Sequence, residues 1–314
     1  MPAFVECVPN FSEGRRPEVV EQIAAAMRAV PGLAVLNVQM DPDHNRSVIT
    51  TVGSPDAVGE AAFRATRVAA GLINLDEHRG EHPRMGATDV IPFVPVREVT
   101  MAECVELARQ VGRRIGEELG IPVYLYEAAA TRPERRDLAA VRRGEYEAIK
   151  AEIATVPERA PDFGPRQVGP AGAVAVGARP YLIAFNVYLG TANLDIAKEI
   201  ARAVRHSSGG LRYVKALGLA VEEGVQVSMN LTDFTRTPIH RVVEMIRSEA
   251  RRHGVPITRS EIVGLVPQQA LLEAAIWYLQ LDDFESNQVL ENRLADLEEA
   301  EGAANHLGAG GGPC

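Results

Sequence analysis

The chain has 314 residues, of which 46% are hydrophobic and 24% are charged, a composition typical of a globular protein with one large or two medium domains. Its formal net charge of -9 argues against nucleic acid as a partner, because nucleic-acid binding requires a basic surface. No stretch approaches the roughly 20 apolar residues of a membrane helix, and the first residues lack the basic start and apolar run of a secretory signal. We therefore expect a cytoplasmic protein with no membrane partner. The three cysteines lie far apart, which excludes a disulfide framework or a Cys-x-x-Cys metal unit.

Apolar patterning in the first half of the chain predicts alternating strands and helices. Strands are expected at 3–8, 33–38, 47–52, 90–96 and 122–126, and helices at 17–28, 55–73 and 101–119. Ser54 is the expected cap of the second helix, and Thr100 with Glu103 forms a capping-box pattern ahead of the third. Pro92 and Pro95 indicate that the fourth strand lies at a sheet edge or follows a bulged course.

The same order of elements returns after residue 180. Strands are expected at 181–189, 213–221, 225–231 and 261–266, and helices at 194–204, 237–253 and 268–279. This repetition predicts an α+β fold of two ferredoxin-like lobes, each a sheet with helices packed on one face. A single continuous sheet is the alternative, because element order does not show which strands pair. The predicted domains are 1–178, 179–285 and 286–314, the last with a helix and a Gly-rich tail, and residues 156–172, rich in Pro and Gly, are expected to connect the lobes without regular structure.

The loop at 76–89 holds two histidines, two arginines and four carboxylates between a helix and a strand. A histidine titrates near neutrality and can take up and return a proton, and a neighbouring carboxylate such as Glu81 or Asp89 could orient it. Arg79 and Arg84 could hold substrate carboxylates bidentately. These are the parts that transfer of an acyl-like group requires, although a solvated charged loop without a function has the same composition.

A metal site is a rival interpretation, because His78 and His82 are four residues apart with acidic residues nearby. Gly80 and Pro83 argue against the helix that would place both histidines on one face, and the His-Glu-x-x-His motif is absent, so we expect no metal. The loop at 41–46 is a second polar cluster with the composition of a turn, and 9–14 is a third that could simply cap the first helix.

Several motifs resemble one family along the whole length of the two predicted lobes. They are Val5-Glu6-Cys7-Val8-Pro9-Asn10-Phe11-Ser12-Glu13-Gly14, Gly80-Glu81-His82-Pro83-Arg84-Met85-Gly86-Ala87, Pro122-Val123-Tyr124-Leu125-Tyr126, Asp162-Phe163-Gly164-Pro165, Leu182-Ile183-Ala184-Phe185-Asn186 and Gly264-Leu265-Val266-Pro267. In this order they are similar to glutamate formiminotransferase, the N-terminal part of animal formiminotransferase-cyclodeaminase. The resemblance spans roughly residues 3 to 280. No second catalytic domain follows it, so we expect no cyclodeaminase activity.

The resemblance implies transfer of a formimino group from N-formimino-glutamate to N5 of tetrahydrofolate, a late step of histidine degradation that feeds one-carbon metabolism. It further implies a homodimer, a folate tunnel between the lobes, tetrahydrofolate as co-substrate and His82 as the catalytic residue. A folate contact by the connector is implied as well. The residues expected to bind substrate are Asn10, Asn45, Arg46, Arg84, Gly86 and Arg179, with Gly164, Pro165, Arg166, Gln167, Val168, Gly169, Pro170, Ala171 and Gly172 of the connector.

Our mechanistic hypothesis is that His82 takes the N5 proton and then protonates the departing glutamate nitrogen. Gln39 stands where the animal enzymes carry an acidic residue, with Asp41 and Asp43 close by, and Glu81, Asp41 and Asp89 are all candidates to orient His82. Three alternatives remain open at this point: a formyl transferase that uses N-formyl-glutamate, a folate-binding protein without catalysis and, last, a metal-dependent hydrolase.

Overall fold

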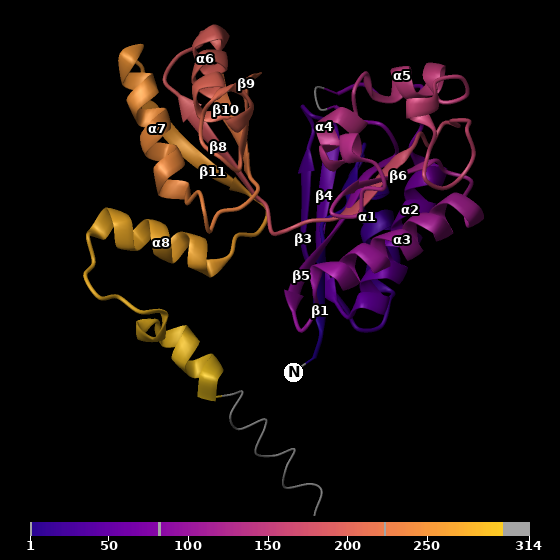
Figure 1. The fold of residues 1–314 in the computed structure, drawn as a ribbon, viewed down its shortest axis with the longest axis horizontal. Coiled ribbons are helices and arrows are strands. Elements are labelled where there is room, and N and C mark those ends of the chain that lie inside the picture. Colours follow the sequence, from indigo (N-terminus) through magenta and orange to yellow (C-terminus); the bar gives the residue numbers. More distant parts are fainter. Residues whose placement is uncertain (1, 81–82, 223, 298–314) are drawn as a thin grey trace, which may run out of the picture.

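The computed structural model describes residues 2–80, 83–222 and 224–297. The described chain forms two lobes, each with its own sheet, joined by a short segment after β7 (Val174–Ala178). Figure 1 shows the two sheets on the inner sides of the lobes and most helices on the outer sides. The mixed α+β class and the two lobes are therefore confirmed, and the single continuous sheet is excluded.

The N-terminal lobe is built on a sheet of seven strands. They are β1 (Phe4–Cys7), β2 (Asn10–Phe11), β3 (Leu33–Asp41), β4 (Arg46–Gly53), β5 (Thr88–Arg97), β6 (Val123–Glu127) and β7. β3 pairs with β4, β1 and β2 both lie between β4 and β5, and β7 and β6 follow beyond β5. The pairs β5–β7 and β6–β7 are parallel, whereas the other pairs of this sheet are antiparallel.

Three helices cover one face of this sheet: α1 (Pro17–Arg28), α2 (Pro55–Leu72) and α3 (Met101–Glu118). Both predicted caps are present, since the Ser54 side chain accepts from the Ala57 amide and Thr100 with Glu103 forms a full capping box. Alternation along β1 buries Val5 and Cys7 completely beneath these helices. Cys104 of α3 is buried as well, so two of the cysteines are core thiols.

Parts of the N-terminal lobe differ from the prediction. β5 is an interior strand with register shifts, so its prolines accompany the bulged course and not an edge. β7, α4 (Leu138–Val141) and α5 (Glu145–Glu152) have no counterpart in the predicted elements. Tyr126 packs with residues of α4 and α5, whereas Leu125 packs with residues of α3, so these two short helices lie against the opposite face of β6.

The C-terminal lobe has the predicted order of elements. They are β8 (Ile183–Leu189), α6 (Leu194–Val204), β9 (Val214–Val221), β10 (Gly224–Leu231), α7 (Ile239–Arg252) and β11 (Ile257–Val263). The strand order is β11–β8–β10–β9 with antiparallel pairs throughout, and β11 begins four residues before the predicted strand. Alternate residues of β8 are buried against α6 and α7. The finer ferredoxin-like assignment of the lobes stays a prediction.

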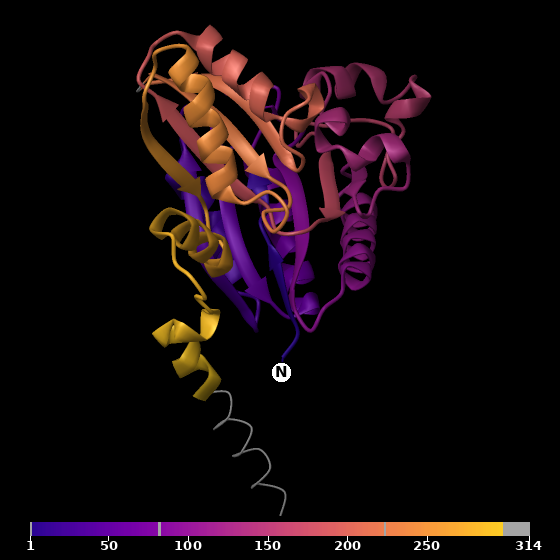
Figure 2. The same cartoon turned by 60° about the vertical axis from the view of Figure 1, so that its left-hand side comes forward.

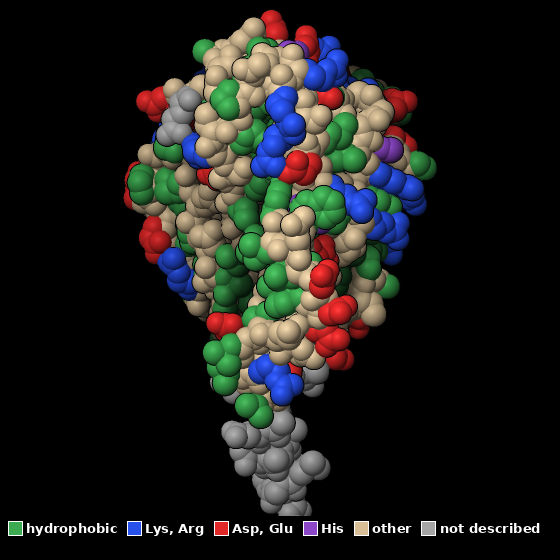
Figure 3. All heavy atoms as spheres, turned by 90° about the vertical axis from the view of Figure 1, so that its left-hand side faces the viewer, with side chains coloured by type: hydrophobic (Ala, Val, Ile, Leu, Met, Phe, Trp, Pro, Cys, Tyr) green, Lys and Arg blue, Asp and Glu red, His purple; other side chains and the backbone are tan. Residues whose placement is uncertain are grey.

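Beyond β11, α8 (Gln268–Leu279) coincides with its predicted bounds and leads to the end of the described chain, which lies away from both sheets (Figure 2). Only Ala270 of this helix is buried, although most of its residues are apolar. The exposed side chains include Leu271, Trp277, Tyr278 and Leu279. Apolar groups are visible among polar ones when the molecule is viewed from the side of this lobe (Figure 3). None of the helices in the described ranges combines the length and apolarity that a bilayer crossing demands.

Candidate active site

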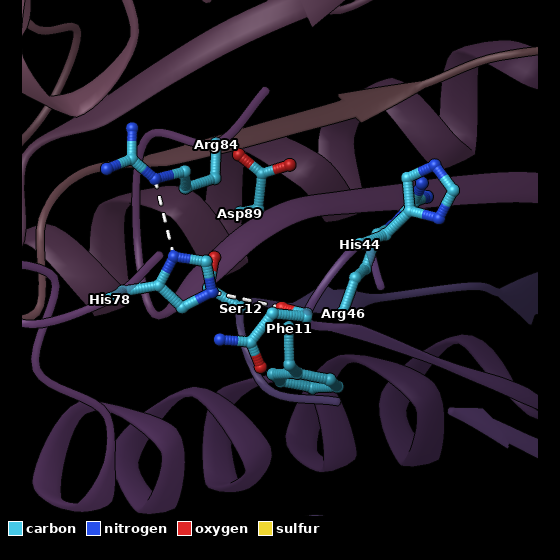
Figure 4. A pocket seen from close by; sticks show the side chains of 8 residues that line it. Phe11, Ser12, His44, Arg46, His78, Arg84 and Asp89 are labelled. Atoms are coloured by element: carbon cyan, nitrogen blue, oxygen red, sulfur yellow. Dashed lines mark hydrogen bonds between the residues drawn. The ribbon is translucent and has the colours of Figure 1, made fainter. Parts of the chain in front are cut away.

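A cavity in the N-terminal lobe gathers polar side chains from four separate stretches of the sequence (Figure 4). It is lined by Phe11, Ser12, His44, Asn45, Arg46, His78, Arg84 and Asp89. They come from β2 and the turn after it, the β3–β4 loop with the first residue of β4, the segment after α2, and the start of β5. The structure thus brings together the three polar loops that the sequence singled out.

β2 is the short strand that assembles this cavity. Asn10 lies opposite Val48 of β4 on one side and Val90 of β5 on the other. Ser12 then donates a buried hydrogen bond of 2.7 Å from its hydroxyl to the Gly86 carbonyl. The chain at 10–12 therefore holds the β3–β4 loop and the start of β5 together, which explains why a possible helix-capping segment is part of the site.

Asp41 and His44 form a pair at the end of β3. The Oδ2 atom of Asp41 lies 2.6 Å from Nδ1 of His44, and its Oδ1 accepts the backbone N–H groups of Asp43 and His44 at 3.0 and 2.9 Å. Asp41 thereby orients the imidazole of His44, a histidine that the sequence placed only in a turn.

Asp89 lies between two arginines. Its Oδ2 pairs with Arg142, and its Oδ1 accepts the Met85 N–H at 2.9 Å. Burial and the charge of Arg142 lower the pKa of Arg46 to about 10, against the opposing charges of Asp89 and Asp41. Arg46 also donates to the Asn10 side-chain oxygen. Two arginines and two carboxylates therefore meet at this end of the cavity, and the guanidinium groups suit a carboxylate-bearing ligand.

Arg142 is a site residue that the sequence reasoning missed. It follows α4, in a stretch between β6 and the connector to which no element was assigned. The neighbouring pair Arg142-Arg143 was a signal of positive charge, but only the three-dimensional fold places one of these arginines against Asp89.

Arg84 is held by carboxylates of α5. Its guanidinium donates to Glu145 at 2.8 Å and to both oxygens of Glu147 at 2.6 and 2.8 Å. These partners occupy the fork with which the sequence predicts that Arg84 binds a substrate carboxylate. The predicted contact stays a prediction, and the ion pairs favour a different role, developed below.

The prediction that residues 156–172 connect the lobes is wrong, because β7 follows them and pairs with β5 and β6 of the N-terminal sheet. This segment, still called the connector, lies within the N-terminal lobe and runs along the loop that precedes β5. The Ala87 N–H donates to the Ala171 carbonyl at 2.8 Å, and the Ala173 N–H donates to the Met85 carbonyl at 2.9 Å. A Cβ atom on Gly86 would lie 1.9 Å from the Ala173 carbonyl oxygen, so only glycine permits this approach. Most of the connector is exposed at 164–170, apart from the buried Val168, and these residues remain accessible to a ligand.

Arg179 lies elsewhere, at the start of the segment that joins the lobes, and is absent from the described lining of the cavity. Its backbone N–H donates to the Phe93 carbonyl at 3.0 Å, and its charge acts on Glu6 of β1. Burial raises the pKa of Glu6 to about 7, and Arg179 opposes this shift.

Glu81 and His82 lie outside the described residues. Of the other two carboxylates proposed to orient His82, Asp41 is bonded to His44 and Asp89 to Arg142 and the Met85 amide. Within the described ranges no group of three or more His, Cys, Asp or Glu side chains is placed to hold a metal ion.

Profiles of one protein family match both lobes of the chain. The profile described as "Formiminotransferase domain, N-terminal subdomain" matches residues 4–179, and the profile described as "Formiminotransferase domain" matches residues 184–297. The chain belongs to the formiminotransferase family. It is 52% identical to the glutamate formimidoyltransferase of Thermoplasma acidophilum over 95% of this chain and 100% of that protein. It is 48% identical to the glutamate formimidoyltransferase of Streptococcus pyogenes serotype M1, over 94% of this chain and 99% of the relative.

Animal members of the formiminotransferase family are longer. The formimidoyltransferase-cyclodeaminase of Mus musculus is 47% identical, and the match covers 88% of this chain and 53% of the mouse protein. The family resemblance that the sequence motifs indicated is therefore confirmed.

Proposed function

We propose that this protein is a glutamate formimidoyltransferase that moves the formimino group of N-formimino-L-glutamate to N5 of tetrahydrofolate. The observation that carries the proposal is the end-to-end similarity to two relatives that bear this name, at 52% and 48% identity. The transfer would be a late step of histidine degradation that releases glutamate, and the folate product would enter one-carbon metabolism.

The proposed chemistry is an addition followed by an elimination. N5 of tetrahydrofolate attacks the formimino carbon, the C–N5 bond forms as the π pair of the C=N bond moves onto its nitrogen, and His82 accepts the proton that N5 loses. The tetrahedral intermediate then collapses, the bond from carbon to the glutamate nitrogen breaks, and His82 returns the proton to that nitrogen. His82 thus acts as base and then as acid, and the remaining residues hold two reactants in one geometry.

The described cavity supports this assignment through its charge and its neighbours. Arg46 lines it and supplies a guanidinium that suits the carboxylates of a glutamate-derived substrate. Asn45, which lines the cavity, is proposed to contact substrate, together with Asn10 and Gly86 next to lining residues in the sequence. The exposed part of the connector, 164–170, is proposed to contact folate. Arg179, farther along the chain, is proposed to meet the folate tail between the lobes.

We also propose a cytoplasmic homodimer with the three domains 1–178, 179–285 and 286–314. The exposed apolar helix α8 supports association, because contiguous exposed apolar surface commonly marks a contact with another chain. Sedimentation or light scattering over a range of concentrations tests the dimer, and a monomer throughout the range would contradict it.

The test of the function is a comparison of donors with the purified full chain. Turnover with N-formimino-glutamate and tetrahydrofolate, and much slower turnover with N-formyl-glutamate, is the expected result. The reverse preference would assign a formyl transferase, and tight folate binding without transfer from either donor would assign a binding protein. Exhaustive chelation is expected to leave turnover unchanged, whereas its loss would favour the metal-dependent alternative.

A further inference from the structure

His78 and Arg84 are six residues apart and their side chains meet inside the lobe. Each residue is 8% exposed. Nε of Arg84 lies 3.4 Å from Nδ1 of His78, a long hydrogen bond, and Nε2 of His78 lies 3.0 Å from the Asn45 carbonyl oxygen (Figure 4). An arginine nitrogen can only donate, so Nδ1 must accept. The imidazole is therefore neutral, and its proton sits on Nε2 and is donated to Asn45.

His78 and the two residues after it are held against the β3–β4 loop. The Asn45 side chain accepts the Gly14 N–H at 3.0 Å and donates to the Arg79 carbonyl at 2.9 Å. A Cβ atom on Gly80 would lie 2.4 Å from the His44 carbonyl oxygen, so the two backbones touch. These contacts hold the chain at 78–80 against the β3–β4 loop.

Arg84 is held against α5. Besides the ion pairs of its guanidinium with Glu145 and Glu147, the Arg84 carbonyl accepts the Tyr146 N–H at 3.0 Å. Turning the guanidinium toward a ligand would break these ion pairs together with the bond to His78.

We propose that His78 and Arg84 are positioning residues of the transfer reaction. Their contact fixes the segment before residues 81 and 82 relative to the segment after them. This inference rests on the proposed function, in which His82 handles the proton. In this role Arg84 supports His82 and does not bind a substrate carboxylate. His78 acts through its contact with Arg84, and neither binds a metal nor transfers a proton.

The electrostatic surroundings agree with a neutral His78. Burial lowers the pKa of His78, the charges of Arg84 and Arg15 lower it further, and the Asn45 carbonyl and Glu13 oppose them. A second proton would remove the acceptor that Arg84 uses and place an imidazolium against the guanidinium. The pair is therefore kept intact at neutral pH.

The test is a double-mutant cycle with His78→Ala, Arg84→Met and both changes together, measured with N-formimino-glutamate and tetrahydrofolate. Each single change should lower kcat by about 10- to 100-fold with KM values within about threefold, and the double variant should be little worse than either single variant. His78→Gln, which keeps a neutral donor and acceptor, should stay within about tenfold of wild type. His206→Ala, the loss of an exposed histidine in the other lobe, is the matched control and should change nothing.

Amide hydrogen exchange provides a readout that does not depend on turnover. In His78→Ala, peptides covering 78–87 should exchange about tenfold faster than in wild type, while peptides of the C-terminal lobe stay unchanged. Wild-type exchange in this variant, additive losses of kcat, or a raised KM with unchanged kcat would overturn the inference. A wild-type protein that transfers nothing but shows the faster exchange in the variant would contradict the proposed function and still support the positional coupling.

Discussion

The connector is held to the N-terminal lobe by a buried ion pair between Arg135 and its own Asp162. Their side chains are 4% and 8% exposed, and Nη1 of Arg135 lies 2.6 Å from Oδ2 of Asp162. The same oxygen accepts the Leu125 N–H at 2.8 Å, and Thr131 donates to the other carboxylate oxygen. Arg135→Met would leave the carboxylate buried with neutral donors only.

Breaking a buried pair in this way costs about 3–5 kcal/mol, because an uncompensated charge stays inside the protein. With an m-value of about 2 kcal/mol/M in urea, the unfolding midpoint of the N-terminal lobe should fall by roughly 2 M. Adding Asp162→Asn should restore part of the loss, because the double variant buries no unpaired charge. The KM for tetrahydrofolate should rise more than kcat falls, since Asp162 lies in the connector just before the part, from Gly164 on, that is proposed to contact folate.

Urea unfolding followed by two probes measures this effect. Far-UV circular dichroism reports on both lobes, whereas fluorescence of Trp277, the single tryptophan, reports on α8 beside the C-terminal lobe. The fall of the urea midpoint in Arg135→Met should appear in the circular dichroism signal and be smaller in the fluorescence of Trp277. Arg114→Met is the control, because Arg114 forms ion pairs with Glu60 and Glu118 but its side chain is 39% exposed. Its loss should cost under about 1 kcal/mol. Equal costs for the two arginine variants would refute the reasoning.

Two further predictions concern the same lobe. Burial raises the pKa of Glu6 to about 7 from 4.5, so the folded state binds this proton more tightly than the unfolded chain, and about 3 kcal/mol of stability is lost as the pH rises from 4.5 to 7. Glu6→Gln should match wild type at pH 4.5 and exceed its free energy of unfolding by about 3 kcal/mol above pH 7; parallel pH profiles would sink the idea. Gly86→Ala should cost about 3 kcal/mol or more in urea unfolding, because its Cβ would strike the Ala173 backbone, whereas Gly71→Ala, with nothing within 4 Å of the new Cβ, should cost nothing; equal stability of the two would count against this account.

Much of the fold could be predicted because its signals are local. Helical spacing located α1, α6 and α8 to the residue, and the caps at Ser54 and Thr100 are read from a few neighbouring residues. β7 was missed because it is a short run of small apolar residues whose parallel partners lie far away in sequence. Its pairing is decided by tertiary contacts, which periodicity does not encode.

The site was predictable in composition but not in its connections. The density of charge at 76–89 identified the loop, and the family resemblance gave its histidine a task. That Arg84 would meet Glu145 and Glu147 depends on α5, about 60 residues away in sequence, and the partner of Asp89, Arg142, comes from the same unassigned stretch. Such long-range charge pairs follow from the fold and not from local pattern.

The proposed mechanism depends on His82, which takes up and returns the proton of the formimino transfer. The most direct measurement is turnover of N-formimino-glutamate with tetrahydrofolate by wild type and His82→Asn side by side, together with the folate dissociation constant of each. Wild type should transfer the group rapidly, whereas kcat of the variant should fall by about 100-fold or more and its dissociation constant for folate should change little. Turnover of His82→Asn at the wild-type rate would contradict this mechanism.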